Sequence, residues 1–372
     1  MDGFDVLVIG GGIAGAAAAF ALAGSARVLL AETEPVLAFH TTGRSAAQYL
    51  ENYGSDQVRR LTLASRAFLD SPPGGEPSLL SPRAMLAVGR EDQRAELVGL
   101  AERGRALVPS IRLVDGDEVA ALCPVLRPEH AVAGVLEPGA SDIDVARLHQ
   151  ILVAGLRRSG GEVRAGSPVT ALARARGGWL ATVGGERVEV AAVVNAGGAW
   201  ADDVARLAGL ATVGLRPLRR TAFTVSCERD TAGWPLVNDV DERWYFKPEG
   251  PGQLLCSLAD ETLSDPCDAR PDEADVALAL DRINEATTLR LRHVRIAWAG
   301  LRTFAPDREL VLGADPAEPT FVWSAGQGGY GIQTAPAVGT FVASAVLGRG
   351  LPAELAATGV RPELVSPARF AG

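Results

Sequence analysis

Three glycines and one acid near the start of the chain have the spacing of a dinucleotide-binding loop. An apolar run over residues 6–9 ends at Gly10, and Gly12 and Gly15 follow before a run of small apolar residues. Gly10 permits a tight turn, Gly12 lets the backbone approach a pyrophosphate, and Gly15 lets a helix pack closely on a sheet. Glu32 ends a second apolar run, where a carboxylate binds ribose hydroxyls and disfavours a 2′-phosphate. The pattern predicts a βαβ unit that holds phosphates at a helix N-terminus and does not take NADP.

Composition and charge exclude several functional classes. The 372 residues carry 45 acidic and 36 basic side chains, a net charge of −9, so no basic face for nucleic acid is expected. The 4 cysteines and 4 histidines are not spaced as metal ligands, and we expect reduced thiols and no metal. The apolar segment over residues 6–23 contains several glycines and follows no positive region. It predicts a strand, turn and helix of a cytoplasmic enzyme, not a signal peptide or an integral membrane segment.

Periodic patterns predict the elements that position the remaining motifs. Helical spacing of apolar residues over 57–70 and 144–158 predicts two helices, and short alternating runs after them predict strands. Residues 191–200 and 321–334 each have the pattern of an apolar strand, a glycine turn and a helix start. The length predicts two domains, and alternation over 216–258 predicts a second, largely antiparallel sheet.

Several motifs, taken together, resemble those of the D-amino-acid oxidase superfamily of FAD enzymes. They are the N-terminal βαβ unit and the stretches His40–Ala47, Asn195–Trp200, Trp298–Arg302 and Gly326–Thr334. Within the superfamily the chain is most similar to the bacterial D-arginine dehydrogenases, over nearly its whole length. The resemblance implies an α/β fold, in which a Rossmann-like FAD-binding domain carries an inserted, largely antiparallel β-sheet substrate domain. It assigns residues 1–78, 142–215 and 297–372 to a discontinuous FAD-binding domain and residues 79–141 and 216–296 to the substrate-binding domain.

The resemblance also implies non-covalent FAD, not NAD, as the cofactor. A glycine loop that opens a helix presents backbone N–H groups, which suit the negative charge of a reduced flavin. The residues implied in FAD binding are Gly10, Gly12, Ile13, Ala14, Gly15, Glu32, Thr42, Gly43, Arg44, Ser45, Ala46, Ala47, Val169, Ala196, Gly197, Trp200, Gly300, Arg302, Gly328, Gly329, Tyr330, Gly331, Ile332, Gln333 and Thr334.

Two arginines in apolar strands match the superfamily's carboxylate-binding pair. Arg302 closes one apolar run and Arg220 lies within another, whereas strand alternation turns Arg219 to the opposite face. An arginine fork bonds both oxygens of a carboxylate, which the point charge of a lysine cannot do. The resemblance adds three further site residues, namely Tyr245 on the same carboxylate, Tyr53 on a loop over the site, and the Gly329 carbonyl beside the substrate amine.

Three positions depart from the dehydrogenase pattern. Gln48, Leu50 and Met85 replace a histidine, a threonine and the glutamate that pairs with the substrate guanidinium. A buried guanidinium without a partner costs on the order of 3–5 kcal/mol. An apolar side chain instead gains about 25 cal/mol for each Å² buried against Met85 and Leu50. We therefore expect D-amino acids with neutral, mostly apolar side chains to be better substrates than D-arginine or D-lysine.

The implied reaction is oxidation of the Cα–N bond of a D-amino acid by hydride transfer to flavin N5, after which the imino acid hydrolyses to a 2-oxo acid and ammonia. The same site could oxidise a secondary or N-substituted amino acid of the sarcosine, proline or opine type. A 2-hydroxy acid is a third candidate, with His40 as the base that its hydroxyl needs. A flavin-binding structural or sensor protein is the non-enzymatic alternative, which the intact substrate arginines disfavour. Oxygen and a quinone or dye stay open as electron acceptors, and Lys247 could be an oxygen-activating cation or an ion-pair partner.

Overall fold

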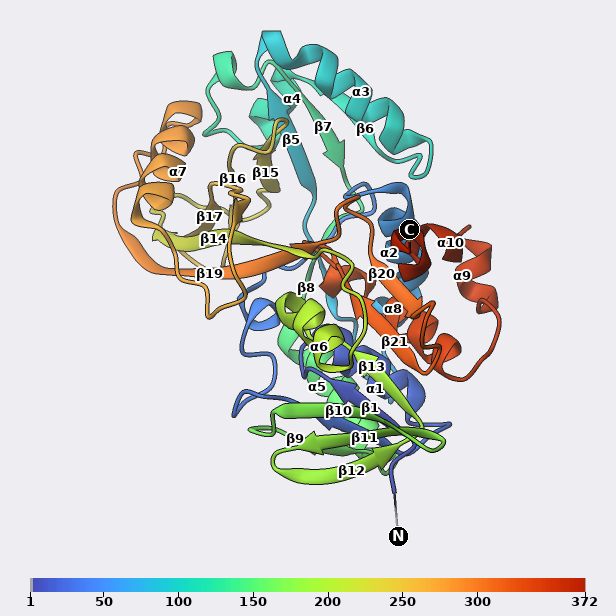
Figure 1. The fold of residues 1–372 in the computed structure, drawn as a ribbon. Coiled ribbons are helices and arrows are strands. Elements are labelled where there is room, and N and C mark those ends of the chain that lie inside the picture. The colour runs from blue at the N-terminus through green and yellow to red at the C-terminus, as the bar shows by residue number, and fades with distance from the viewer. Residues whose placement is uncertain (1–2, 372) are drawn as a thin grey trace.

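A six-stranded sheet and a nine-stranded sheet organise the chain (Figure 1). The computed structural model describes residues 3–371. The first sheet carries the predicted glycine turns, and the second carries both predicted substrate arginines. These two sheets confirm the predicted α/β class with a second, largely antiparallel sheet. The domain limits stay a prediction.

The six-stranded sheet is ordered β20-β21-β13-β1-β2-β9 and is parallel except for the edge pair β20 and β21. Alternate residues of β1 point to opposite faces, so Val6 and Val8 pack with helices while Leu7 and Ile9 pack with a further layer. The strands are β1 Val6–Ile9, β2 Val28–Ala31, β9 Glu162–Arg164, β13 Ala192–Asn195, β20 Val311–Ala314 and β21 Phe321–Ala325.

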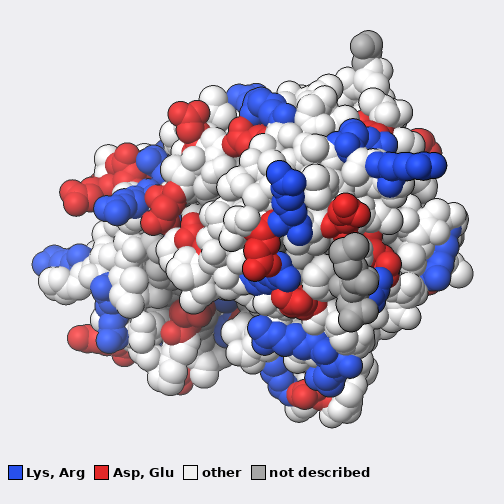
Figure 2. Space-filling model, turned by 60° about the horizontal axis from the view of Figure 1, so that its bottom comes forward, with Lys and Arg blue, Asp and Glu red and all other residues white. Residues whose placement is uncertain are grey.

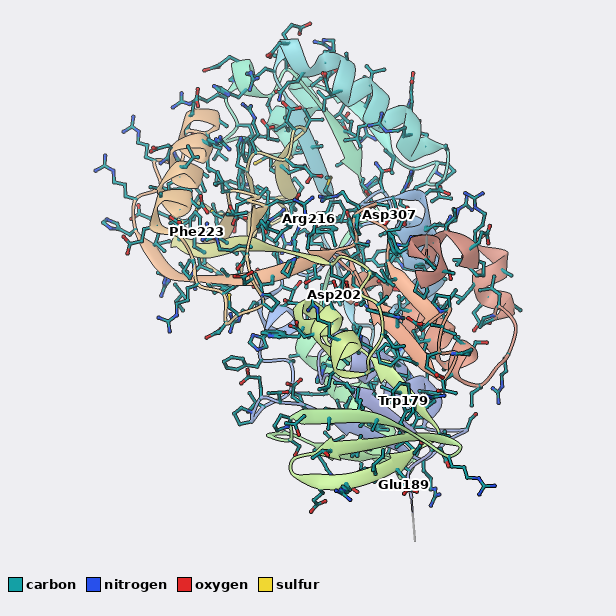
Figure 3. The ribbon with its side chains drawn as sticks, viewed as in Figure 1. Trp179, Glu189, Asp202, Arg216, Phe223 and Asp307 are labelled. Carbon is teal, nitrogen blue, oxygen red and sulfur yellow. The ribbon has the colours of Figure 1, made fainter. Side chains whose placement is uncertain are left out.

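Helices cover one face of this sheet and a small sheet covers the other (Figure 1). The helices are α1 Ile13–Leu22, α2 Asp56–Asp70, α5 Val145–Arg158 and α8 Gly331–Val346, with α6 Ala201–Leu207 on the opposite side. The small sheet contains β10 Val169–Ala175, β11 Gly178–Val183 and β12 Glu186–Val190. Trp179 of β11 is buried in the same cluster as Leu7, whereas Glu189 on the neighbouring strand is exposed (Figure 3).

The nine-stranded sheet is ordered β18-β14-β17-β16-β15-β5-β7-β6, and β19 pairs with β14. All its pairs are antiparallel except β15 with β5. Helix α7 covers one face, and α3 covers the other face at β5 and β7. The elements are β5 Met85–Gly89, α3 Arg94–Arg105, β6 Arg112–Asp115, β7 Ala133–Glu137, β14 Arg216–Ser226, β15 Leu236–Asp239, β16 Tyr245–Pro248, β17 Gln253–Ser257, β18 Thr262–Leu263, α7 Glu273–Ala286 and β19 Val294–Phe304.

Short elements connect the two sheets. A three-stranded sheet, ordered β3-β8-β4, brings residues 48–49 beside the entry to β5. The connecting elements are η1 Thr41–Arg44, β3 Gln48–Tyr49, β4 Leu80–Pro82, η2 Glu91–Gln93, α4 Gly116–Leu122, η3 Pro128–His130, β8 Ser141–Ile143, η4 Gly198–Trp200, α9 Ala353–Ala357, α10 Pro362–Val365 and η5 Pro367–Phe370.

Charged side chains of both signs intermingle over the face of the molecule in Figure 2. Within residues 3–371, none of the helices has the length and apolar character needed to cross a membrane.

Candidate active site

The turn between β1 and α1 has a backbone that only glycine fits. Gly10 has a φ of 107°, and a Cβ there would lie 2.4 Å from the carbonyl oxygen of Ala196. A Cβ on Gly15 would lie 1.9 Å from the Gly10 oxygen, so α1 packs directly on the turn. His149 of α5 places Nε2 2.9 Å from the Gly11 oxygen, a contact that the sequence did not predict. The turn is therefore held rigidly ahead of the first N–H groups of α1.

Glu32 lies at the end of β2, beside this turn. Its Oε2 accepts a hydrogen bond from the Gly11 N–H at 2.6 Å, and its Oε1 accepts one from the Glu34 N–H at 2.9 Å. A cavity of about 520 Å³ opens here, and the predicted cofactor residues that line it are Gly10, Gly12, Glu32, Thr42, Val169, Ala196, Gly197 and Trp200. A glycine turn, a helix N-terminus and a carboxylate at one cavity fit the adenosine and pyrophosphate parts of FAD.

A second cavity, of about 140 Å³, continues from the first, because Gly12, Thr42 and Ala196 line both. Among the described residues, Thr303 Oγ1 is buried without a hydrogen-bond partner, and Thr303 lines this cavity. An unpaired buried hydroxyl is a group left for a ligand, so the cavity fits the polar flavin half of FAD. The predicted residues on its wall are Gly12, Ile13, Ala14, Thr42, Arg44, Ser45, Ala46, Ala196, Gly300, Arg302, Gly328, Gly329, Gly331 and Ile332.

Arg44 joins the loop after β2 to strand β19. Its Nη1 donates to the carbonyl oxygens of Ala299 at 2.9 Å and Ala269 at 3.0 Å, and its Nη2 pairs with Asp268 at 2.6 Å. The Arg44 carbonyl in turn accepts a hydrogen bond from Trp298 Nε1 at 2.9 Å. The guanidinium therefore positions the loop that walls the second cavity.

Several predicted cofactor residues support the cavity walls from behind. Gln333 binds the Leu50 N–H through Oε1 and the Leu50 carbonyl through Nε2, both at 3.2 Å. The Thr334 hydroxyl donates to the Tyr330 carbonyl at 2.9 Å. The turn of α8 directs these two side chains into protein, so they hold loop backbone instead of lining the cofactor cavities. The other predicted cofactor residues outside these two cavities are Gly15, Gly43, Ala47 and Tyr330.

Arg302 and Arg220 lie on the paired strands β19 and β14. Arg302 Nη1 donates to the Tyr53 hydroxyl at 3.1 Å, and Arg220 Nε donates to the Asp260 carbonyl at 2.7 Å. Burial and the neighbouring charge of Arg302 lower the pKa of Arg220. Glu261 lies 3.6 Å from Arg220 Nη2 and offsets part of the repulsion between the two guanidinium groups. The buried Arg220 and the half-buried Arg302 together still favour an anion bound between them, as a substrate carboxylate would be.

A chamber of about 580 Å³ opens at this arginine pair. Arg220, Tyr245, Arg302 and Gly329 line both the chamber and the second cavity, so the chamber reaches the flavin side of the cofactor site. The structure brings all the predicted substrate-site residues to the wall of this chamber: Gln48, Leu50, Tyr53, Met85, Arg220, Tyr245, Arg302 and Gly329.

Three acids that line the chamber, Asp56, Glu137 and Glu242, were not predicted, and of these only Glu137 is buried. Glu137 ends β7, is the direct antiparallel neighbour of Met85 on β5, and is only 3% exposed. The expectation that Met85 leaves the chamber without a carboxyl group is therefore wrong, because strand pairing brings in an acid from a distant segment. The available sequence signal was the acid that closes the apolar run over 133–136.

Two basic residues do not line the chamber. Arg219 pairs with Asp275 at 2.8 Å, which confirms that it faces opposite to Arg220. Lys247 Nζ lies 2.9 Å from Asp142 and 3.2 Å from Glu249, so it is an ion-pair partner.

His40 lies at the adenosine side of the cofactor site. It lines the first cavity, and its Nε2 is 2.9 Å from Glu34 Oε1. This position does not serve a base at the arginine pair. Residues 3–371 contain no group of three or more His, Cys, Asp or Glu side chains arranged to hold a metal ion.

Known proteins share both the sequence pattern and the fold. The family model for FAD dependent oxidoreductases (DAO) matches residues 5–345. FAD-dependent oxidoreductase domain-containing protein 1 of Bos taurus is 27% identical, over 92% of this chain and 81% of that protein. Glycine oxidase from Geobacillus kaustophilus has a TM-score of 0.85 and 21% identity, over 98% of each chain. L-Proline dehydrogenase from P. horikoshii has a TM-score of 0.85 and 19% identity, over 99% of this chain and 98% of that one. The chain therefore belongs to the DAO family of FAD-dependent oxidoreductases.

Proposed function

We propose that the protein oxidises the Cα–N bond of α-amino acids, with a preference for D-amino acids that have neutral side chains. The observation that carries this proposal is the arginine pair at the junction of the chamber and the flavin-side cavity. Arg220 and Arg302 offer two guanidinium forks at one place, which suits the two oxygens of a carboxylate. The Tyr53 hydroxyl, 3.1 Å from Arg302 Nη1, adds a further polar group beside that carboxylate.

The residues around the pair can orient the rest of the substrate. Tyr245 and Gly329 line both spaces, so the Tyr245 hydroxyl is suited to donate to the substrate carboxylate and the Gly329 carbonyl to accept from the substrate amine. Bound FAD supplies the two-electron acceptor for the hydride that leaves Cα. The nitrogen loses its proton to water, and the C=N product then hydrolyses to a 2-oxo acid and ammonia. No protein base is required, because the amine can bind already neutral.

The chamber indicates the size and charge of the preferred side chain. Its volume of about 580 Å³ is in the range of about 300–1,000 Å³ that holds drug-sized ligands, and far exceeds what glycine requires. Met85 and Leu50 provide apolar wall. A neutral side chain avoids the cost of stripping water from a charge in this enclosed space.

Substrate handedness follows from three directions around Cα. The arginine pair fixes the carboxylate, the chamber accepts the side chain, and the flavin-side cavity defines where the Cα–H must point. Only one enantiomer satisfies all three. The motif resemblance to D-arginine dehydrogenases supports the D configuration.

A secondary amine, as in proline or an N-substituted amino acid, is the second candidate. The fold similarity to L-proline dehydrogenase favours it, and the same carboxylate clamp would serve. A 2-hydroxy acid is less well supported, because its hydroxyl needs a base and His40 pairs with Glu34 at the other end of the cofactor site.

Anaerobic bleaching of the flavin absorption tests the proposal. The FAD-loaded protein would be mixed with D- and L-amino acids, N-methyl amino acids, proline and 2-hydroxy acids. We expect fast bleaching by neutral D-amino acids with long side chains. Bleaching by hydroxy acids alone, or by no compound in the panel, would contradict the proposal, and a preference for N-methyl amino acids or proline would select the second candidate.

A further inference from the structure

One face of the nine-stranded sheet forms a wall of the chamber. Glu137 of β7 pairs with Met85 of β5, which pairs with Leu236 of β15. Two residues along β15, Asn238 pairs with Tyr245 of β16. Residues paired directly across strands point to the same face, as do residues two apart on one strand. Glu137 therefore shares a sheet face with Tyr245. It lies three strands away from it, about 14 Å across the sheet at the usual strand spacing, and is offset by two residues along the strands.

Glu137 has one occupied oxygen and one free oxygen. Its Oε1 accepts hydrogen bonds from the Glu51 N–H at 2.5 Å and the Asn52 N–H at 3.3 Å, which holds the segment next to Tyr53. Its Oε2 makes no hydrogen bond or ion pair with any residue between 3 and 371. A carboxyl that is 3% exposed, with an unpaired oxygen in a ligand chamber, is suited to accept a hydrogen bond from the ligand.

Two amides of the same chamber also have unpaired acceptors. Gln48 Nε2 donates to Asp142 Oδ1 at 3.0 Å, which assigns the other amide atom as oxygen because a carboxylate only accepts. Asn238 Nδ2 donates to the Asp239 carbonyl at 3.1 Å, which assigns Oδ1 in the same way. Among the described residues, Gln48 Oε1 and Asn238 Oδ1 are buried without a hydrogen-bond partner. The chamber wall thus has a surplus of acceptors.

The charges near Glu137 favour an uncharged donor over a cation. Burial is the main cause that raises the pKa of Glu137 to about 7, and the Glu51 charge acts in the same direction. The hydrogen bonds from the Glu51 and Asn52 N–H groups and the Arg59 guanidinium on α2 oppose the shift. The carboxyl is then not fully ionised at neutral pH and offers only part of a counter-ion. Arg59 also lines the chamber, and among the described residues its Nε is buried without a partner, so it repels a cation but can donate to a carbonyl.

We infer that the chamber selects α-amino acids whose long side chain ends in an uncharged N–H donor group, a carboxamide or a ureido group, and that Glu137 is the specificity residue that accepts from it. This inference rests on the proposed oxidation of amino acids at the same site. A carboxamide or ureido group carries both the N–H donors that the free acceptors lack and the carbonyl that Arg59 can bind.

The first test compares matched substrates on the wild-type holoenzyme. D-Glutamine and D-methionine have side chains of similar length, but only the former ends in N–H donors. D-Citrulline and D-arginine differ mainly in a ureido against a guanidinium group. We expect kcat/KM to be roughly tenfold or more higher for the first member of each pair, which corresponds to one good buried hydrogen bond. A preference for D-methionine or for D-arginine would overturn the inference.

The second test is Glu137→Gln, which separates recognition from loop support. The glutamine oxygen still accepts from Glu51 and Asn52, while its NH₂ replaces the free acceptor with a donor. We expect kcat/KM for D-glutamine to fall roughly tenfold, and kcat/KM for D-methionine to fall by a clearly smaller factor, so that the ratio between the two substrates changes. Glu129→Gln, the same change at an exposed position on η3, is the control that should alter neither value.

The outcomes keep the inference separate from the proposed function. Failure of every amino acid to bleach the flavin would remove the proposed function itself. Bleaching by the panel, with the same D-glutamine to D-methionine ratio in wild type and Glu137→Gln, would leave that function standing and overturn the inference. A uniform loss on all substrates with a lowered melting temperature would show that Glu137 only supports the loop, which would also overturn it.

Discussion

The cofactor cavities and the substrate chamber differ in the groups that line them, which are backbone in the first and side chains in the second. The cofactor cavities are lined largely by backbone at glycine turns, as at Gly10, Gly12 and Gly328. The chamber is lined mostly by side chains, which come from several strands, helices and loops. Backbone groups bind the parts that every FAD molecule shares, whereas a single substitution can change one side chain of the chamber. The first region can therefore stay constant while the second determines the substrate.

Arg302→Met tests whether the two regions can be separated, because Arg302 lines both. The loss of a charge-assisted, bidentate contact should lower kcat/KM for every amino acid by more than about a hundredfold, roughly 3 kcal/mol. FAD content and the flavin spectrum should stay nearly unchanged, since the substitution leaves the glycine turns intact. Anaerobic stopped-flow reduction and FAD released on denaturation measure the two effects.

The matched control is Arg295→Met, an exposed arginine on the same strand. It should leave both kcat/KM and FAD content at wild-type values. Loss of FAD together with activity in Arg302→Met would show that this arginine belongs to the cofactor site and that the regions are not separable there.

Features of local sequence were predictable. The β1–α1–β2 unit follows from glycine spacing, and the opposite directions of Arg219 and Arg220 follow from strand alternation. Contacts that depend on how distant strands pair were not predictable. Glu137 becomes part of the site only because β7 pairs with β5 in the register that places it beside Met85. The sequence also did not predict where side chains point at the start of α8. Gln333, for example, was predicted to bind FAD, but its side chain binds the Leu50 backbone.

Gly10→Ala tests the backbone character of the cofactor region. The substitution adds a Cβ at a φ of 107° and 2.4 Å from the Ala196 oxygen, so the turn must shift. Strain of about 2 kcal/mol predicts roughly thirtyfold weaker FAD binding. Flavin fluorescence on titration of the apoprotein measures the change. Gly24→Ala is the control, because a Cβ there meets nothing within 4 Å; equal FAD affinity for both variants would mean that the turn tolerates a side chain.

The last prediction concerns the pH dependence of stability. Burial raises the pKa of Glu137 from 4.5 to about 7 in the folded protein. The folded state therefore binds this proton more tightly than the unfolded chain, and the contribution of Glu137 to the free energy of unfolding falls as pH rises from about 4.5 to 7. Glu137→Gln lacks this titration. Relative to wild type, the variant should gain on the order of 3 kcal/mol across that interval and little further above it.

Thermal unfolding of the holoenzymes between pH 4 and 9 measures this difference. Glu129→Gln, at an exposed position, should follow the wild-type curve throughout. A constant offset between Glu137→Gln and wild type at all pH values would mean that Glu137 titrates normally in the folded protein. The chamber would then hold a fully charged carboxylate at neutral pH and would suit a cationic side chain. The pH dependence therefore decides whether the substrate chamber, unlike the cofactor cavities, accepts a positively charged group.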